Sequence, residues 1–450
     1  MSEEATMRIQ NPDEEIPSQP RRALLRERAV RWGKLLGVFF AGQSLVQAIG
    51  LVTGFLLIRW LSVESYAQFS VAFGFQSTIG ALADLGFCGS VVALAGARGA
   101  QPEVLGGYIA AALHYRRMIL TVLFPITIVA LPLLMTKHDW SWEVQVALLT
   151  SVLCSIFAQG YLSLYTAPLL IHQKLKESYG TQVVAATSRL SLNTVLHLLS
   201  VLGAATAAWA ATLATVLNAL LFRRSTRPLV KQPADADKAA RWEMLGYVAP
   251  LIPGIIFTAF QGQITLFVIA TFGRDKSIAE IAALGRLGQV LVILGTLNAV
   301  ILSPYFAKLP HAMLGRRYAQ ILFVAIVAAA AIVAAAFAWP GALLWILGAK
   351  YAHLRQQVSW SIVAWAISYI GGVMWSIHSA RKWVFWWGTW AYITTLLVVQ
   401  VAAVKFMDLS TTMNVVFFSI ITSMAVLFVH IATAVYGFAN DGGSDRIKSS

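Results

Sequence analysis

The sequence predicts an all-α polytopic membrane protein, with about twelve transmembrane helices in two pseudo-symmetric six-helix lobes. Hydrophobic residues make up 58% of the 450 residues and charged residues only 12%, and the mean hydropathy is +0.69. A soluble domain with this composition lacks the polar surface to cover so much apolar sequence. The apolar runs have roughly the 20 residues that a helix needs to cross the hydrocarbon core, and short polar joints separate them.

Taken in order, these runs give six spans in each half of the chain. The first half has spans at 36–58, 66–94, 107–134, 143–169, 181–200 and 202–222, and the second half has spans at 243–271, 278–303, 320–347, 356–379, 384–404 and 413–437. The longest polar joint lies between the two halves. The predicted units are a basic N-terminal tail (1–35), an N-lobe (36–222), a linker (223–242), a C-lobe (243–437) and a C-terminal tail (438–450).

Lysines and arginines are concentrated on one side of this predicted arrangement. If both termini face the same side, that side receives 25 of the 34 basic residues, the opposite loops receive seven, and two lie inside spans. The positive-inside rule then places both termini and the linker in the cytoplasm. The net charge of +14 is explained by these anchors at the lipid surface, without a nucleic-acid partner. The polar start of the chain has no cleavable signal pattern.

Several chemistries have no matching pattern in the chain. Cys88 and Cys154 both fall within predicted spans, where they are expected to be packing residues rather than disulfide or zinc partners. The sequence has no phosphate-binding Gly-x-x-x-x-Gly-Lys loop and no His-Glu-x-x-His spacing, so no bound metal or cofactor is expected. Because the polar joints are too short for an enzymatic domain, a transporter is favoured over an enzyme. A membrane-embedded glycosyltransferase or polymerase is the chief enzyme alternative.

Two segments resemble a known family. The run LLIRWLSVESYAQFSVAFGFQSTIGALADLGF at 56–87 is similar to the first signature of the polysaccharide flippases of the multidrug/oligosaccharidyl-lipid/polysaccharide exporter (MOP) superfamily. Its matching positions are Arg59, Leu61, Glu64, Tyr66, Leu85 and Gly86, and Ala67 stands where the family usually has glycine. The run EIAALGRLGQV at 280–290 resembles the family's eighth span, although the usual aromatic residue after the turn is missing.

This resemblance implies a flippase that works by alternating access. Its substrate would be a polyprenyl-diphosphate-linked oligosaccharide, moved to the outer leaflet of a bacterial inner membrane for O-antigen or exopolysaccharide biosynthesis. Expected partners are this lipid-linked substrate, membrane lipids, a polysaccharide polymerase and export machinery. A H⁺ or Na⁺ gradient or the membrane potential would drive transport. The alternatives are a cation-coupled drug or small-molecule antiporter of the same superfamily and a non-transporting scaffold.

Two arginines inside spans are the first candidate binding residues, because an intramembrane charge is costly unless it pairs or faces water. Arg189 lies in the fifth span with Asn193 one turn later, and Arg286 lies in the eighth span with Gln289 one turn later. One arginine from each lobe would suit a diphosphate in a shared cavity, because guanidinium binds phosphate oxygens through two parallel hydrogen bonds. Alternatively, each arginine pairs with Asp84 or with helix carbonyls and only fixes packing.

Glutamines supply most of the remaining polarity inside the spans. Gln43 and Gln47 share a helical face with Gly50 and Gly54 in the first span, and Gln261 lies on a face of similar spacing in the seventh span. These faces either line a sugar-compatible cavity or bring helices into close contact through small residues.

Two further features of the spans concern coupling and movement. Asp84 is a lone acid in the second span and is a candidate proton or sodium site, or alternatively an anchor for a neighbouring span. Pro250 and Pro253 at the start of the seventh span remove backbone hydrogen bonds and bend the helix. The bend is either a hinge for movement of the lobes or a fixed kink.

Overall fold

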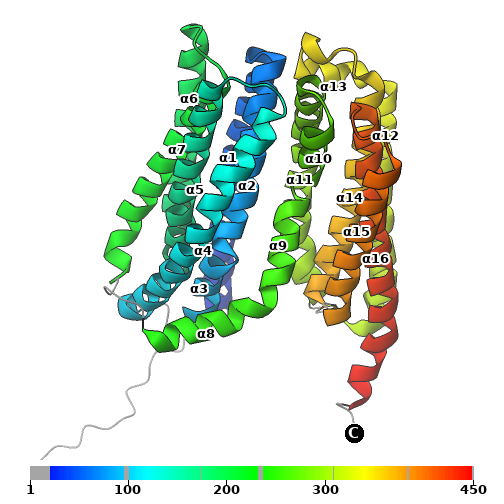
Figure 1. Cartoon of the computed structure of the whole chain (residues 1–450). Coiled ribbons are helices and arrows are strands. Elements are labelled where there is room, and N and C mark those ends of the chain that lie inside the picture. The colour runs from blue at the N-terminus through cyan, green and yellow to red at the C-terminus, as the bar shows by residue number, and fades with distance from the viewer. Residues whose placement is uncertain are drawn as a thin grey trace, which may run out of the picture.

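A computed structural model describes residues 21–95, 101–172, 174–231, 237–307, 309–381, 383 and 385–447. These residues fold into long helices, and no strand occurs among them. The first half of the chain forms the helices α1 (Arg21–Trp60), α2 (Val63–Asp84), α3 (Phe87–Ala95), α4 (Pro102–Thr136), α5 (Trp142–Ile171), α6 (Leu175–Leu198) and α7 (Ala204–Thr226). They stand together on one side of the molecule (Figure 1).

Most of the second half of the chain forms the other group of helices, whereas its first long helix, α8 (Lys238–Val248), packs against the first group. After the turn η2 (Arg227–Leu229) and α8, this half contains η3 (Ala249–Leu251), α9 (Ile252–Gln261), α10 (Ile264–Phe272), α11 (Asp275–Ala307), α12 (His311–Ala338), α13 (Pro340–Leu347), η4 (Ala349–Tyr351), α14 (Arg355–Ala380), α15 (Trp386–Phe406) and α16 (Thr412–Ile447). Helix α8 lies across one end of the bundle, where α1 begins and α16 ends (Figure 1). We call this the linker end, and the opposite end, where α1 meets α2, the Arg59 end.

The predicted all-helical membrane architecture is confirmed. Ten helical stretches of the described residues are long and apolar enough to cross a membrane. Helices α6 and α11 are not among these ten stretches, although they contain 24 and 33 residues. They carry the two arginines that the sequence places inside spans. The number of twelve crossings therefore stays a prediction. Helix α1 begins at Arg21 and α16 ends at Ile447, so both predicted tails are partly helical.

Several predicted spans are broken rather than continuous. The second span breaks at Leu85 and Gly86, which have φ angles of 43° and 83° in the left-handed region, so α2 ends at Asp84 and α3 begins at Phe87. The ninth span breaks at Trp339, because Pro340 has no N–H to continue a helix and disfavours a helical residue before it. The helical bends thus arise where a backbone donor is lost or a left-handed residue interrupts the helix.

The predicted seventh span is divided into three helices. Pro250 lies in η3, between α8 and α9, and Pro253 is the second residue of α9. The chain turns at this point from the transverse helix α8 into the upright helix α9 (Figure 1). A second break at Gly262 and Gln263 separates α9 from α10. The two prolines therefore mark the corner by which the linker enters the second group of helices.

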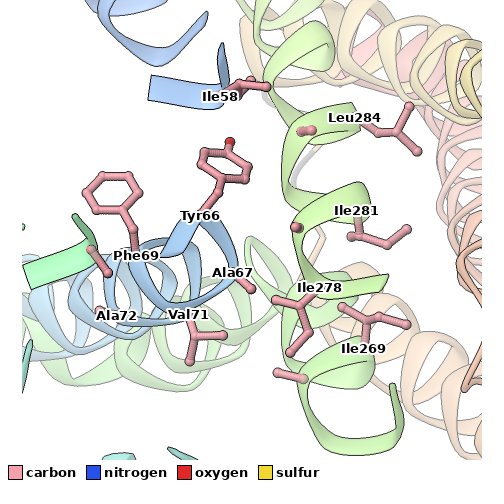
Figure 2. Close-up of a cluster of buried hydrophobic side chains, with 14 of the residues drawn as sticks. Ile58, Tyr66, Ala67, Phe69, Val71, Ala72, Ile269, Ile278, Ile281 and Leu284 are labelled. Carbon is pink, nitrogen blue, oxygen red and sulfur yellow. The ribbon is translucent and has the colours of Figure 1, made fainter. Parts of the chain in front are cut away.

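At the Arg59 end, the two groups of helices share one hydrophobic core. Ile58 of α1 and Tyr66 of α2 belong to the same buried cluster as Ile278, Ile281 and Leu284 of α11. Figure 2 shows Tyr66 on α2 opposite the isoleucines of α11. At the linker end the buried clusters are separate: one joins α3, α4, α5 and α8, and another joins α11, α12, α14 and α16. In this structure the lobes are sealed together at the Arg59 end.

Polar contacts reinforce this seal. Arg59 Nε donates to the carbonyl of Ile346 at 3.2 Å, and Arg59 Nη2 donates to the carbonyl of Trp345. Lys350 Nζ donates to the carbonyls of Arg59 at 3.0 Å and Leu61 at 2.6 Å. These bonds join the α1–α2 turn to α13 and η4 of the other lobe. Burial lowers the pKa of the Lys350 ammonium, which lies outside the candidate spans.

Removal of these contacts is expected to open the Arg59 end. In a variant without native cysteines, a cysteine at Ala279, which is fully buried in the shared core, reports access of a membrane-impermeant maleimide. Arg59→Ala with Lys350→Ala should raise the labelling rate by about tenfold or more, since hydrogen bonds to charged groups contribute about 1.5–3 kcal/mol each. Lys405→Ala, an exposed cation at the end of α15, is the matched control. Equal labelling in all three proteins would contradict a role for these bonds in closure.

Candidate functional site

The two predicted intramembrane arginines converge on one aromatic ring. Arg189 of α6 has its guanidinium carbon 5.9 Å from the centroid of the Phe73 ring, and Arg286 of α11 has its own at 5.0 Å from the same centroid. The two guanidinium carbons therefore lie no further apart than these two distances combined. The charge of Arg286 acts directly on Arg189. Helices from both lobes thus place two cations near one ring, that of Phe73 on α2.

This arginine pair lies at mid-depth. Arg189 is nine residues before the end of α6, Phe73 is ten residues after the start of α2, and Arg286 is eleven residues after the start of α11. At 1.5 Å per residue, each lies roughly 15 Å below the Arg59 end. A hydrocarbon core is about 30 Å thick, so the pair is near the middle of the membrane. Transporters that alternate between two lobes bind their substrates at this depth.

Neither arginine forms an ion pair with an acid among the described side chains. Arg286 donates from Nη1 to Gln289 Oε1 at 3.4 Å, and its Cδ lies 3.5 Å from the position that a Cβ of Gly54 would occupy. The Nε atom of Arg189 is buried without a hydrogen-bond partner. Two neighbouring cations repel each other, and a buried donor without a partner is costly. An anion with several oxygens would relieve both costs at once.

The first helix extends this site toward the linker end. Gln43, Gln47 and Gly50 lie on the same face of α1 as Gly54, the glycine that contacts Arg286. Space is open in front of Gly50, where a Cβ would meet nothing within 4 Å. Gln47 is exposed and Gln43 is half-buried. The amides of this face are thus available on the linker side of the arginines, while the Arg59 side is sealed.

The structure places other predicted residues away from the arginine pair. Asn193 is buried, and its Nδ2 donates to the carbonyl of Arg189 at 2.9 Å within the same helix. Gln261 accepts a hydrogen bond from Gln400 Nε2 at 2.9 Å, which turns it toward α15. Together they form part of a groove of about 350 Å³ between α9 and α15, which is lined mainly by apolar side chains. Thr265, one turn further, bonds with Ser419 of α16.

Asp84 lies at the break between α2 and α3. Its Oδ1 accepts a hydrogen bond from the backbone N–H of Cys88 at 3.1 Å, so it supports the start of α3. The charge of Arg116 on α4 also interacts with the Asp84 carboxylate. The guanidinium of Arg116 also donates to the carbonyls of Ala83 at 3.4 Å and Ile156 at 2.6 Å. These contacts give Asp84 an anchoring role, and its part in ion coupling stays a prediction.

Arg116 corrects the sequence-based charge distribution. The charge count grouped it with the joint before the third span, although the predicted span (107–134) contains it; it lies within α4 and is only 6% exposed. The side chain fills the space beside Gly160 of α5, where a Cβ would come within 1.6 Å of the guanidinium carbon. The molecule therefore holds at least three arginines inside its helix bundle. Arg116 binds helix carbonyls, whereas Arg189 and Arg286 both lie near the Phe73 ring.

Phe73 is a site residue that sequence reasoning did not select. Nothing in the chain distinguishes it from Phe69 or Phe75, since all three lie in the same helix. Its position becomes informative only when α6 and α11 are placed around α2. Its neighbour Gly74 lies beside Gln263, whose Oε1 is 3.3 Å from the position of a Cβ at residue 74. Among the described residues, no group of three His, Cys, Asp or Glu side chains is positioned to hold a metal ion.

No protein-family model matches the chain, and no curated protein matches it. Several solved structures match it in fold. An inward-facing multidrug-resistance MATE transporter of the MOP superfamily matches with a TM-score of 0.64 at 15% identity, over 89% of this chain and 96% of that one. The lipid II flippase MurJ in an inward closed conformation matches with a TM-score of 0.62 at 12% identity, over 89% and 91% of the two chains.

A third similar structure is a MOP-superfamily transporter from Pyrococcus furiosus, described by the reverse polarity of its binding pocket. It matches with a TM-score of 0.53 at 15% identity, over 91% of this chain and 95% of that one. The chain therefore has the fold of MOP-superfamily transporters.

Proposed function

We propose that this protein is a flippase for a polyprenyl-diphosphate-linked oligosaccharide, and that Arg189 and Arg286 bind its diphosphate. The observation that carries the proposal is the convergence of these two arginines on Phe73 at mid-depth, without an acid among the described side chains to neutralise them. A diphosphate offers the oxygens and the negative charge that two guanidinium groups recognise best.

The charge of the site argues against the main alternative. A cation-coupled drug antiporter needs negative charge in its cavity to hold a cationic drug, whereas two neighbouring arginines would repel it. Both MATE transporters and MurJ have the fold of this chain, so the fold alone does not choose between these functions. The arginine pair favours an anionic substrate, and the open amide face of Gln43 and Gln47 suits a hydrated sugar.

The proposed mechanism is alternating access in a bacterial inner membrane. With the Arg59 end closed, the head group enters from the linker end, which we assign to the cytoplasm because of its basic residues. The arginine pair neutralises part of the diphosphate charge while the polyprenyl tail stays in the lipid. The lobes then part at the Arg59 end, and the corner at Pro250 and Pro253 lets the linker follow this movement.

The energy for transport is part of the proposal. Outward movement of an anion is favoured by an inside-negative membrane potential, at about 2.3 kcal/mol per charge per 100 mV. A H⁺ or Na⁺ gradient, for which Asp84 is the predicted site, is the alternative source. The product would be used by a polysaccharide polymerase and export machinery for O-antigen or exopolysaccharide.

Mass spectrometry of lipids tests this function in cells. A strain that lacks the gene should accumulate polyprenyl-diphosphate-linked repeat units and lose surface polysaccharide, and the wild-type gene should restore both. Unchanged lipids and surface polymer, together with new sensitivity to cationic drugs, would contradict the proposal and support a drug antiporter.

A further inference from the structure

A cavity at the Arg59 end is formed by both lobes. It has a volume of about 630 Å³, and its lining combines Arg59 from the end of α1 with residues of α13, η4 and the start of α14. Helix α13 lies at this end of the molecule (Figure 1). Because the N-lobe contributes Arg59 and the C-lobe contributes the rest, the cavity is complete only while the lobes meet here.

Three cations line this cavity, namely Arg59, Lys350 and Arg355. The lining contains no acid, and none of the three forms an ion pair with an acid among the described side chains. The sequence places only seven basic residues in the loops on this side of the membrane, so three of those seven gather in one cavity. Like charges disfavour each other at short range, and an anion between them removes this cost.

The hydrogen bonds that join the lobes hold two of these cations in place. Arg59 donates from Nε and Nη2, and Lys350 donates from Nζ, but every acceptor is an uncharged backbone carbonyl. Nη1 of Arg59 and the third N–H of Lys350 are left for another acceptor. Gly348, with a φ angle of 96°, permits this packing, because a Cβ there would lie 3.3 Å from Cγ of Arg59.

The third cation lies at the start of a long helix. Arg355 is the first residue of α14, which has 26 residues, and its side chain is exposed. The N-terminus of a helix carries a partial positive charge that favours a bound anion. Arg355 takes no part in the bonds that join Arg59 and Lys350 to carbonyls across the lobes. Its charge can therefore be removed without the loss of those bonds.

Two tryptophans place the cavity at the level of the lipid head groups. Trp339 and Trp345 lie at the two ends of α13 and are 69% and 74% exposed. Tryptophan is enriched at the membrane–water interface, where its ring lies among the head groups. Trp345 lines the cavity, and the guanidinium carbon of Arg59 lies 5.1 Å from the centroid of its ring. An anion at this depth is most readily supplied by a phospholipid.

We propose that this cavity binds the phosphate of an anionic phospholipid from the outer leaflet, and that the bound lipid holds the Arg59 end closed. The outer leaflet and the closed state rest on the orientation and the alternating access of the proposed function. Since the two lobes supply different cations, the lipid binds the closed state more tightly than the open one. A ligand shifts such an equilibrium by the ratio of its two affinities.

Quenching of a fluorophore tests the binding. A cysteine at Ala352, an exposed residue of the lining, carries a fluorophore in protein with Cys88→Ala and Cys154→Ser, reconstituted in phosphatidylcholine nanodiscs. Phosphatidylglycerol with a nitroxide near the head of an acyl chain should quench it at about tenfold lower content than phosphatidylcholine with the same nitroxide. Unlabelled phosphatidylglycerol should reverse the quenching, whereas inorganic phosphate should not.

Substitutions assign this effect to the cavity. Arg355→Ala should lower the apparent affinity for phosphatidylglycerol about tenfold, because a charged hydrogen bond to phosphate is lost. Lys405→Ala removes an exposed cation at the same end but outside the lining, and should keep the wild-type affinity. Equal quenching by the two lipids, or an unchanged affinity in Arg355→Ala, would overturn the site. Displacement by inorganic phosphate would overturn a lipid as its ligand.

Maleimide labelling of a cysteine at Ala279 tests the effect on closure. Phosphatidylglycerol in the nanodisc should slow labelling about tenfold in the wild type and leave it unchanged in Arg355→Ala. Quenching by phosphatidylglycerol without slower labelling would overturn the closing role of the lipid. The absence of labelling in every lipid, even with added polyprenyl-diphosphate lipid, would instead contradict the alternating access of the proposed function, and the quenching result would still decide whether the cavity binds the lipid.

Discussion

Charge reversal at Arg189 and Arg286 is expected to stop export of the lipid-linked substrate. Each guanidinium that binds a phosphate contributes about 1.5–3 kcal/mol, and a glutamate in its place adds repulsion. Loss of both should reduce export by more than about a hundredfold, because each 1.4 kcal/mol corresponds to a factor of ten. The Phe73 ring holds both groups in one place, so either single reversal should already be severe.

The measurement compares lipid-linked repeat units and surface polysaccharide in cells that carry each variant at equal membrane levels. Arg189→Glu, Arg286→Glu and the double alanine variant should resemble the strain without the gene. Arg317→Glu is the control, because Arg317 is a half-buried arginine of α12 whose Nη1 donates to Gln320 of the same helix. Normal export by the double alanine variant would contradict the proposed role of the pair.

Loss of Arg116 is expected to destabilise the N-lobe rather than to change substrate binding. Its guanidinium joins α4 to the carbonyls of Ala83 in α2 and Ile156 in α5, and it acts on Asp84. Removal of one partner from a buried charged network typically costs about 3–5 kcal/mol, since the remaining charge is left uncompensated. Gly160→Ala should act in the same direction, because its Cβ would displace the guanidinium from its carbonyl partners.

Thermal unfolding of the purified protein in detergent measures this effect. Arg116→Ala and Gly160→Ala should both lower the midpoint clearly, whereas Arg117→Ala, the exposed neighbour in the same helix, should leave it nearly unchanged. Export per molecule of folded Arg116→Ala protein should stay close to that of the wild type. A stable Arg116→Ala protein that fails to export would contradict the structural role and place Arg116 in the transport pathway.

The sequence predicted the membrane architecture, and it singled out Arg189 and Arg286, because both inferences follow from the cost of polarity in lipid. Long apolar runs have few alternatives to spanning helices, and a charge within such a run needs a partner or water. The same rule applied to Arg116, which lies inside the predicted third span (107–134), but its charge was counted with the basic residues of the preceding joint. Gly160, which gives Arg116 its space, lies 44 positions later in the chain.

Other features depend on contacts between helices, and the residue pattern within one helix could not predict them. The left-handed residue Leu85 gives no local signal for the break between α2 and α3, whereas Pro340 marks its own break plainly. Gln261 has the spacing of a cavity residue, yet a partner on α15, Gln400, determines where it points. The convergence of Arg189 and Arg286 on Phe73 likewise brings together residues from distant parts of the chain.

The central claim is that the arginine pair carries a diphosphate-linked oligosaccharide across the membrane. The most direct test is flipping in proteoliposomes that contain only this protein and a polyprenyl-diphosphate oligosaccharide with a fluorophore on its sugar. With wild-type protein, a membrane-impermeant quencher should reach lipid from both leaflets, because inner-leaflet molecules are brought to the outside. With Arg189→Glu and Arg286→Glu, it should reach only the outer-leaflet fraction. Wild-type protein that leaves the inner-leaflet fraction protected, with or without a membrane potential, would contradict the account.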